Sequence, residues 1–352
     1  MSDSPGHHDL PRTRTAMAAE IAQAPEAIAR LLDREGAAIR TLGRRIAERS
    51  PPVIVTCARG SSDNAAAYAK YLFEILAGIP VASVGPSVAS VYGARLRLDG
   101  GVVLSVSQSG KSPDIVALQK GARASGALAI AIVNEAQSPL AAEADAVVPI
   151  HAGPGRSVAA TKTFLASAAA LAALAAAVAG DQALERAVAG LPEIMAKALS
   201  LDWDAARDAL ASAPSAYLLG RGPAFPIAQE AALKLKETAV LHAEAYSSAE
   251  VMHGPLQLVG AGFPVIALRP ADAAFASTGE TLRRIAAAGG RVFAAEVGDA
   301  APGRLPSMST GHPFLDPLPM LASFYRLAEA VARDRGHDPD APSQLKKVTE
   351  TI

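Results

Sequence analysis

The chain has 352 residues, of which 50% are hydrophobic, 4% are aromatic and 19% are charged. This length suits two ordinary domains, and the high apolar content excludes an intrinsically disordered chain. The net charge of −1 at pH 7 creates no overall field for nucleic acid or an anionic membrane, so neither partner is expected. The single cysteine, Cys57, excludes an internal disulfide framework and a cysteine-rich metal site.

The polar N-terminus lacks the apolar run of a signal peptide, which together with the lone cysteine predicts a soluble cytoplasmic protein. Residues 15–50 are expected to form an N-terminal helix. The longest apolar stretch, residues 164–179, is mostly alanine and short for a membrane span. We interpret it as a buried helix, and a subunit interface is one place where it could lie.

After the N-terminal helix, short β-branched runs alternate with helical patterns, which predicts parallel strands joined by helical crossovers. The strands expected in the first half of the chain are 53–56, 81–84, 102–106, 128–133 and 146–150. The helices expected there are 63–76, 113–125 and 158–179.

The second half repeats this plan. Residues 215–222 (SAYLLGRG) match residues 53–60 (VIVTCARG), each a strand that ends in Arg-Gly before a helix. Strands at 264–268 and 291–296 then match those that begin at 102 and 128. Chance recurrence of strand and glycine turns is the alternative, but three elements in the same order favour a duplicated α/β domain. The domains are expected to join near residues 180–214.

The first candidate site is LSVSQSGKS at residues 104–112, where a buried strand leads into a helix. Gly110 permits a tight turn, and hydroxyls and free backbone N–H groups gather where the helix dipole favours an anion. Ligands of open α/β sheets bind at this end of the strands. The alternative is a polar loop in which Ser112 only caps the helix. A P-loop is excluded, because Ser105 stands where that motif needs glycine.

Two further stretches offer polar groups. GSSDN at residues 60–64 is a second strand-to-helix turn, which gives either further anion donors or an ordinary capped helix start. In EAALKLKE (230–237), Lys234 and Glu237 share a helix face among apolar residues. A buried carboxylate needs a partner or a raised pKa, the condition for a general base, whereas the alternative is a surface ion pair. His253 precedes Gly-Pro and could equally be a solvated loop histidine.

Taken together, these strings resemble the SIS (sugar isomerase) family. The resemblance is to the isomerase half of glutamine–fructose-6-phosphate amidotransferase and to stand-alone glucosamine-6-phosphate deaminases of the second type. The matching strings occur in family order: LSVSQSGKS (104–112), VAATKTF (158–164), LGRG (219–222), EAALKLKE (230–237), HAEAY (242–246), HGPL (253–256) and LKKVT (345–349).

The resemblance implies two tandem SIS domains, each a parallel five-stranded sheet sandwiched between helices. Residues 1–42 would be an N-terminal tail and helix, 43–190 the first SIS domain and 200–338 the second. Residues 339–352 would be a C-terminal tail over the active site.

The resemblance also implies roles for individual residues. The pocket for the sugar phosphate would be lined by Ser62, Ser107, Gln108, Ser109, Ser112 and Val158. Glu237 would move a proton between C1 and C2 with support from Lys234, and His253 would open the sugar ring, often in a neighbouring subunit's site. Lys347 would cover the sugar and form a Schiff base with its keto form, with Lys346 as the rival.

The expected activity is conversion of glucosamine 6-phosphate to fructose 6-phosphate and ammonia, without metal or cofactor, in a homodimer with shared active sites. Galactosamine 6-phosphate or a fructosamine-type phosphate are the alternative substrates, and a non-catalytic sugar-phosphate-binding regulator is the alternative of another class. Ser2 stands where the amidotransferase has its catalytic cysteine, so glutamine hydrolysis is not expected. Gly155 replaces a glutamate usual in the family's flap, which leaves the substrate specificity open.

Overall fold

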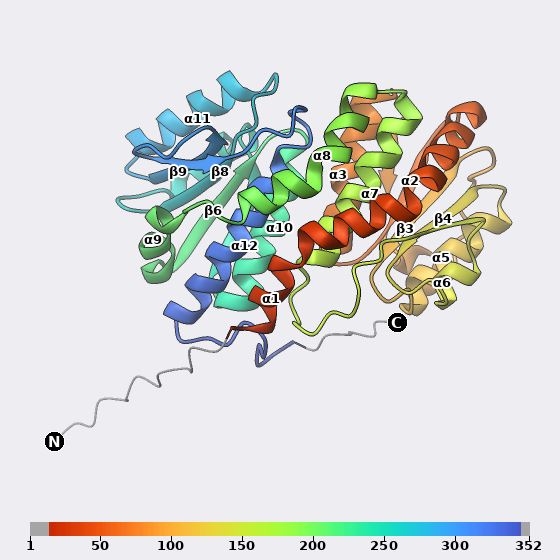
Figure 1. The fold of residues 1–352 in the computed structure, drawn as a ribbon, viewed down its shortest axis with the longest axis horizontal. Coiled ribbons are helices and arrows are strands. Elements are labelled where there is room, and N and C mark those ends of the chain that lie inside the picture. The colour runs from red at the N-terminus through yellow and green to blue at the C-terminus, as the bar shows by residue number, and fades with distance from the viewer. Residues whose placement is uncertain (1–13, 346–352) are drawn as a thin grey trace.

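The computed structural model describes residues 14–345 of the chain. Two parallel five-stranded sheets form its frame (Figure 1), with strand orders β2-β1-β3-β4-β5 and β7-β6-β8-β9-β10, so the fold class expected from the sequence is confirmed. The first sheet consists of β1 (Ile54–Cys57), β2 (Val81–Ser83), β3 (Val102–Ser107), β4 (Leu128–Val133) and β5 (Ala146–Pro149). The second consists of β6 (Ser215–Gly220), β7 (His242–Ser247), β8 (Pro264–Leu268), β9 (Arg291–Val297) and β10 (Arg304–Ser307).

Helices connect these strands and cover both faces of each sheet. In the first half they are α1 (Ala16–Ala22), α2 (Ala24–Arg49), α3 (Ser61–Leu76), α4 (Ser87–Ser90), α5 (Pro113–Ala124), α6 (Pro139–Ala142), α7 (Lys162–Ala179) and α8 (Gln182–Ala198). In the second half they are η1 (Asp204–Ala206), α9 (Arg207–Ser212), α10 (Ala224–Ala239), η2 (Glu250–Met252), η3 (Pro255–Leu258), α11 (Phe275–Ala287) and α12 (Pro317–Asp334).

The alternation of buried residues along the strands explains this layering. Val55, Val103 and Ala129 face α5 and α6 in one apolar cluster, while their neighbours Ile54 and Val102 face the centre of the molecule. Because successive side chains of a strand point to opposite faces, a strand covered on both sides is apolar throughout. All residues of β3 and β4 are accordingly buried.

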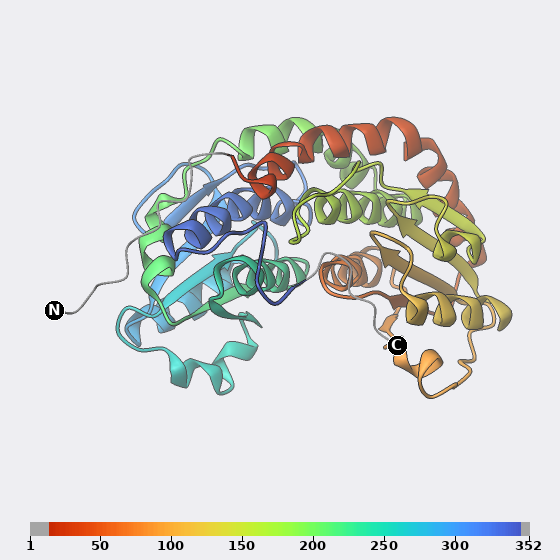
Figure 2. The same ribbon diagram turned by 90° about the horizontal axis from the view of Figure 1, so that it is seen from below.

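One continuous apolar core joins the two halves. It takes the inner face of both sheets together with helices α2, α3, α7, α8, α10 and α12. Figure 2 shows the two sheets in separate lobes, with α7 along the first and α12 along the second, and with α3 facing α10 below them. The frame therefore fixes α3 of the first half against α10 of the second, which is where the polar residues discussed below meet.

Two expectations about helices need correction. The N-terminal helix expected at 15–50 is interrupted at Gln23, because Pro25 lacks an N–H group and begins a new helix more readily than it continues one. The helix expected from residue 158 begins only at Lys162. Residues 158–161 instead belong to the loop that leads from β5 to α7.

Helix α7 is, within residues 14–345, the one helix long and apolar enough to cross a membrane, but 83% of it is buried inside the structure. It packs against α2 and α3 of its own chain, so a second subunit is not needed to cover it. It is a core helix of the fold.

Two edge strands were not expected from the sequence. Strand β7 interleaves polar residues such as Glu244 with small ones, and β10 contains Pro306, so neither has the apolar alternation that indicates a strand. Both lie at sheet edges, where pairing with one neighbour suffices.

Candidate active site

The loop between β3 and α5 is a tight polar turn. Ser107 is buried, and its Oγ accepts a hydrogen bond from the N–H of Gly110 at 3.1 Å. Gly110 has φ +62°, and a Cβ there would lie 2.1 Å from Oγ of Ser138, so both conformation and space require glycine. Ser109 Oγ accepts from the N–H of Lys111 at 3.3 Å, which closes the turn.

Ser112 lies at the N-cap position of α5 but makes no side-chain capping hydrogen bond. Ser112 thus has the cap position that the alternative interpretation gave it, but its hydroxyl is not used for capping. Gln108, Ser109 and Ser112 are all partly buried. The turn thus gathers uncommitted donors at the start of a helix, the arrangement that binds a phosphate.

An ion pair between the exposed Arg59 and the buried Asp114 ties this loop to the turn after β1. Arg59 donates to Asp114 Oδ2 from Nε at 3.1 Å and from Nη2 at 2.7 Å, and Asp114 is fully buried. Strands β1 and β3 are neighbours in parallel register, so their carboxyl ends share one edge of the sheet. Ser62, partly buried in the first turn of α3, is thereby placed at the same edge as Ser107.

Helix α10 carries a charged cluster that faces this edge. Lys234 is fully buried, and its Nζ lies 2.5 Å from Glu237 Oε2 and 3.3 Å from Glu230 Oε1, and donates to Ser61 Oγ at 3.0 Å. Burial opposes the charge on Lys234, but the two carboxylates outweigh it and raise the pKa of the ammonium. The interpretation of Lys234 and Glu237 as a surface ion pair is therefore wrong.

Glu230 joins the cluster to both halves of the molecule, although its role was not foreseen. It is fully buried, and it accepts from Asn64 Nδ2 at 2.9 Å and from the Tyr325 hydroxyl at 3.1 Å. Burial raises the pKa of Glu230, while Lys234 and Asn64 act in the opposite direction. The sequence did contain a signal for this ion pair, because Glu230 stands four residues before Lys234 on an apolar helix. The partners of Glu230 on α3 and α12, however, are distant in sequence.

Glu237 differs from the other charged members because 23% of its side chain is exposed. It is the carboxylate of the cluster that a ligand can reach, and a buried cation holds it in place. That combination suits a group that takes and returns a proton. Among residues 14–345, no group of three or more His, Cys, Asp or Glu side chains is arranged to hold a metal ion.

The remaining candidates lie outside this cluster. His253 is exposed in the turn between η2 and η3, and its side chain makes no hydrogen bond or ion pair within the described part of the chain. Val158 is partly buried in the loop that leads to α7. Lys346 and Lys347 lie outside the described residues.

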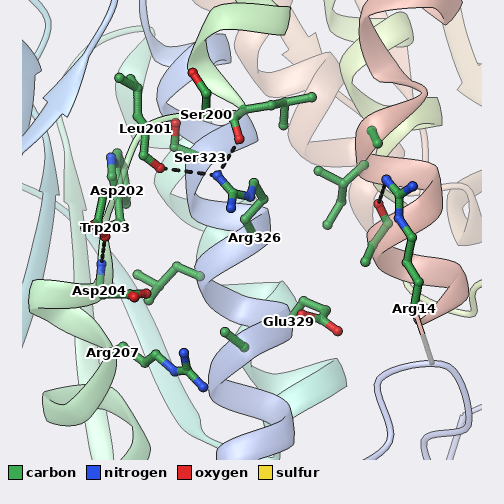
Figure 3. A pocket seen from close by; sticks show the side chains of 16 residues that line it. Arg14, Ser200, Leu201, Asp202, Trp203, Asp204, Arg207, Ser323, Arg326 and Glu329 are labelled. Atoms are coloured by element: carbon green, nitrogen blue, oxygen red, sulfur yellow. Dashed lines mark hydrogen bonds between the residues drawn. The ribbon is translucent and has the colours of Figure 1, made fainter. Parts of the chain in front are cut away.

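A separate pocket of about 580 Å³ lies between α1, α12 and the segment before α9 (Figure 3). Its arginines are already engaged, since Arg326 donates to the main-chain oxygens of Leu199 and Leu201, and Arg207 pairs with Asp334. The pocket does not include the strand ends, and we do not place the active site there.

The arrangement as a whole is a pair of parallel α/β domains, with a polar turn at a helix start on one and a buried cluster of Glu230, Lys234 and Glu237 on the other. The sequence profile of the SIS domain matches residues 49–177 and 209–293. The chain belongs to the SIS domain family.

Similar proteins agree with this assignment. The chain is 36% identical over 314 residues to a glutamine–fructose-6-phosphate aminotransferase of Zymomonas mobilis, a match that covers 84% of this chain and 51% of the relative. The chain thus spans about half the length of the curated relatives it matches.

Two solved structures share the fold. One is a candidate phosphosugar isomerase from Silicibacter pomeroyi, with TM-score 0.88 and 49% identity, covering 93% of this chain and all of that one. A glucosamine-6-phosphate deaminase from Thermotoga maritima has TM-score 0.75 at 21% identity, covering 96% and 100%, and shows the likeness of fold alone.

Proposed function

We propose that the protein is a sugar-phosphate isomerase that acts as an amino-sugar-phosphate deaminase, converting glucosamine 6-phosphate to fructose 6-phosphate and ammonia. The observation that carries the proposal is the partly exposed Glu237, held by fully buried Lys234 on the helix that faces the anion-binding edge of the first sheet. The names of the relatives, which concern phosphosugars and glucosamine phosphates, support the same substrate class.

The proposed reaction moves one proton and then exchanges ammonia for water. In the open-chain aminoaldose, the Glu237 carboxylate removes the proton from C2 while the C1 carbonyl oxygen takes a proton from solvent, which gives an enolamine. Glu237 then returns its proton to C1, which leaves a protonated ketimine at C2 whose extra proton departs with the nitrogen. Water adds to C2 and ammonia leaves, so that substrate and water give fructose 6-phosphate and ammonia. A positioned base contributes on the order of 10²–10⁴-fold to such a step.

The phosphate orients the sugar for this chemistry. The turn of Ser107, Gln108, Ser109 and Ser112, with Ser62 beside it, would hold the phosphate far from the reacting carbons. Binding energy from that end fixes C1 and C2 against Glu237 without competing with the proton transfer. Lys347, or its rival Lys346, is proposed to cover the sugar.

The test is to incubate the protein with glucosamine 6-phosphate and to measure ammonia and fructose 6-phosphate together. Equal amounts of both products are expected. A parallel panel of galactosamine 6-phosphate and a fructosamine-type phosphate identifies the preferred substrate. Absence of ammonia from all three would overturn the proposal. Tight binding without turnover would then support the non-catalytic regulator.

We also propose that the enzyme is a cytoplasmic homodimer with shared active sites. The exposed His253, which has no partner within the described residues of its own chain, is the residue that would enter the neighbouring site. Mixing a Glu237→Gln variant with a His253→Asn variant should restore part of the activity, because one site of the mixed dimer would contain both native residues. A mixture that dimerises and stays inactive would refute the sharing of sites.

A further inference from the structure

Helix α1 contacts the loop of residues 151–157, which leads from β5 toward Val158. Glu20 of α1 is only 6% exposed, and its Oε1 accepts from the N–H of Ser157 at 3.0 Å and from the N–H of Arg156. A carboxylate buried to this extent is costly unless it is hydrogen bonded, and here the bonds come from the loop backbone. Glu20 therefore holds the loop that precedes Val158.

A second contact fixes the same loop from the other side. Lys162, 3% exposed at the start of α7, donates from Nζ to Gln23 Oε1 at 2.7 Å and to the main-chain oxygen of Pro154 at 2.8 Å. Burial lowers the pKa of this ammonium, and the nearby Glu20 partly offsets the effect. The residue that separates α1 from α2 is thus bound to the loop as well.

Helix α2 holds the beginning of the loop. His151 adopts φ +50°, a conformation that costs of order 1–3 kcal/mol for a residue other than glycine. Its main-chain oxygen accepts from Arg30 Nε at 3.3 Å, and its ring Nε2 lies 2.7 Å from Glu35 Oε1. The N-terminal helices therefore hold the loop at both ends, while Asn134 after β4 hydrogen bonds Ala152 and Gly153 between them.

The opposite end of α1 is bound by the C-terminal segment of the chain. Asp340 accepts from the N–H of Ala16 at 2.5 Å and from the N–H of Met17 at 2.8 Å, which satisfies N–H groups that the first turn of a helix leaves free. Thr15 also donates to Glu329 of α12 at 3.0 Å. Asp340 is seven positions before Lys347 in the sequence.

We infer that α1 is a positioning element that couples the C-terminal segment to the loop beside the sugar-phosphate pocket, with Glu20 and Asp340 as its positioning residues. A helix of seven residues has few internal hydrogen bonds of its own, so its position depends on burial of Met17 and Ile21 in the core and on these polar attachments at its two ends. Displacement of the segment after Asp340 is then transmitted through α1 to the loop before Val158. The consequence for catalysis, though not the coupling itself, rests on the proposed function.

The coupling is tested in the full-length protein by hydrogen exchange of the peptide that covers residues 152–160. Glu20→Ala should accelerate exchange there by about 10-fold or more, because the loop N–H groups lose their acceptor. Glu20→Gln, which keeps an acceptor, should restore most of the protection. Glu48→Ala is the matched control, since Glu48 lies at an exposed position of α2 and makes no side-chain contact with the loop.

A second variant, at Asp340, distinguishes coupling through α1 from local support of the loop by Glu20 alone. Asp340→Ala should also accelerate exchange in residues 152–160, by roughly 3-fold or more, while exchange in α11 stays unchanged. The control is Asp33→Ala, at an exposed position of α2. The double variant Glu20→Ala, Asp340→Ala should exchange no faster than the larger single effect, because both act through one helix.

Unchanged exchange of the loop in Asp340→Ala would overturn the proposal, as would an increase that is equal in α11, which would indicate general destabilisation. In the active enzyme, both variants should raise KM for the sugar phosphate about 5-fold with kcat nearly unchanged, because they affect positioning of the phosphate. If the wild-type protein proves inactive, the proposed function fails while the exchange experiment still tests the coupling.

Discussion

The two halves of the molecule share a strand order but differ at the carboxyl ends of their strands. In the first half, the loop after β3 leaves the hydroxyl of Ser112 uncommitted. In the second half, β8 is followed by Arg269, which donates to the Phe275 main-chain oxygen at 3.0 Å, pairs with Glu296 and lies 3.5 Å above the Phe275 ring. The Arg269 side chain is therefore engaged by residues of its own half, whereas Ser112 of the first half has no such partner.

The facing helices α3 and α10 also differ, because the charged side chains of the buried cluster lie on the helix of the second half. Helix α3 of the first half contributes the neutral groups Ser61 and Asn64, whereas α10 of the second contributes Glu230, Lys234 and Glu237. In the proposed function, the first half thus supplies the phosphate site and the second supplies the base. Two domains with the same strand order can carry different functional groups, because their strands and core positions are alike while their loops and helix faces are free to differ.

The largest effect is expected from removing the base of the second half. Glu237→Gln keeps the size of the side chain but cannot take a proton, so kcat should fall by about 10²–10⁴-fold while sugar-phosphate binding is retained. Steady-state kinetics and calorimetric binding check the two parts. Glu193→Gln, on α8 with 75% of the side chain exposed, is the control. A variant that keeps its kcat would remove Glu237 from the mechanism.

Removing the buried cation should reduce stability more than any change in the first half. Lys234→Met leaves Glu230 buried without its ion-pair partner, and the free energy of unfolding should fall by about 3–5 kcal/mol, measured by urea denaturation. Lys236→Met, on the exposed face of α10, should have little effect. Adding Glu230→Gln to Lys234→Met should recover part of the loss, and no recovery would contradict the assignment.

The same variant predicts a dependence on pH. Burial raises the pKa of Glu230, so the folded state holds this proton more tightly than the unfolded state does. Stability then falls as pH rises from the ordinary glutamate value through the raised one. The loss in Lys234→Met should therefore be smaller at about pH 5 than at about pH 8.

A pair of glycine variants compares the turns of the two halves more finely. Gly110→Ala and Gly222→Ala both place alanine at positive φ, which costs about 1–2 kcal/mol. A Cβ at Gly110 also collides with Ser138, whereas nothing lies within 4 Å of one at Gly222, so Gly110→Ala should cost roughly 1–3 kcal/mol more. Thermal unfolding measures the difference. Phosphate binding should weaken only in Gly110→Ala. Equal weakening in both variants would contradict the proposal that the phosphate binds to the turn of the first half.

The smallest effect concerns the ends of the two central strands. Cys57 in β1 occupies the position of Leu219 in β6, and burial, assisted by Asp114, raises the pKa of its thiol to about 12. The thiol therefore fills space as leucine does. A thiol reagent at about pH 8 should leave the native protein unmodified and react fully after denaturation. Rapid modification of the native protein would show that the Cys57 thiol is accessible to solvent in the folded state.

Much of the frame was predictable from the sequence because its signals are local. The apolar runs of β3 and β4 sit between turn residues, and the strings at 104–112 and 230–237 carry their chemistry within one turn or one helix. Edge strands β7 and β10 escaped prediction because a strand with one neighbour needs no apolar alternation. The break at Gln23 was missed because the helical pattern continues on both sides of it.

By itself, then, the sequence determined the class of fold, the polar turn at residues 107–112 and the pairing of Lys234 with Glu237, since each depends on residues a few positions apart. Tertiary structure alone decided that Glu230 binds Asn64 and Tyr325, and that Glu20 and Asp340 attach α1 to two distant segments. These contacts join elements far apart in the chain. Hydrophobic packing of the shared core sets their distance, and no local pattern of residues encodes it.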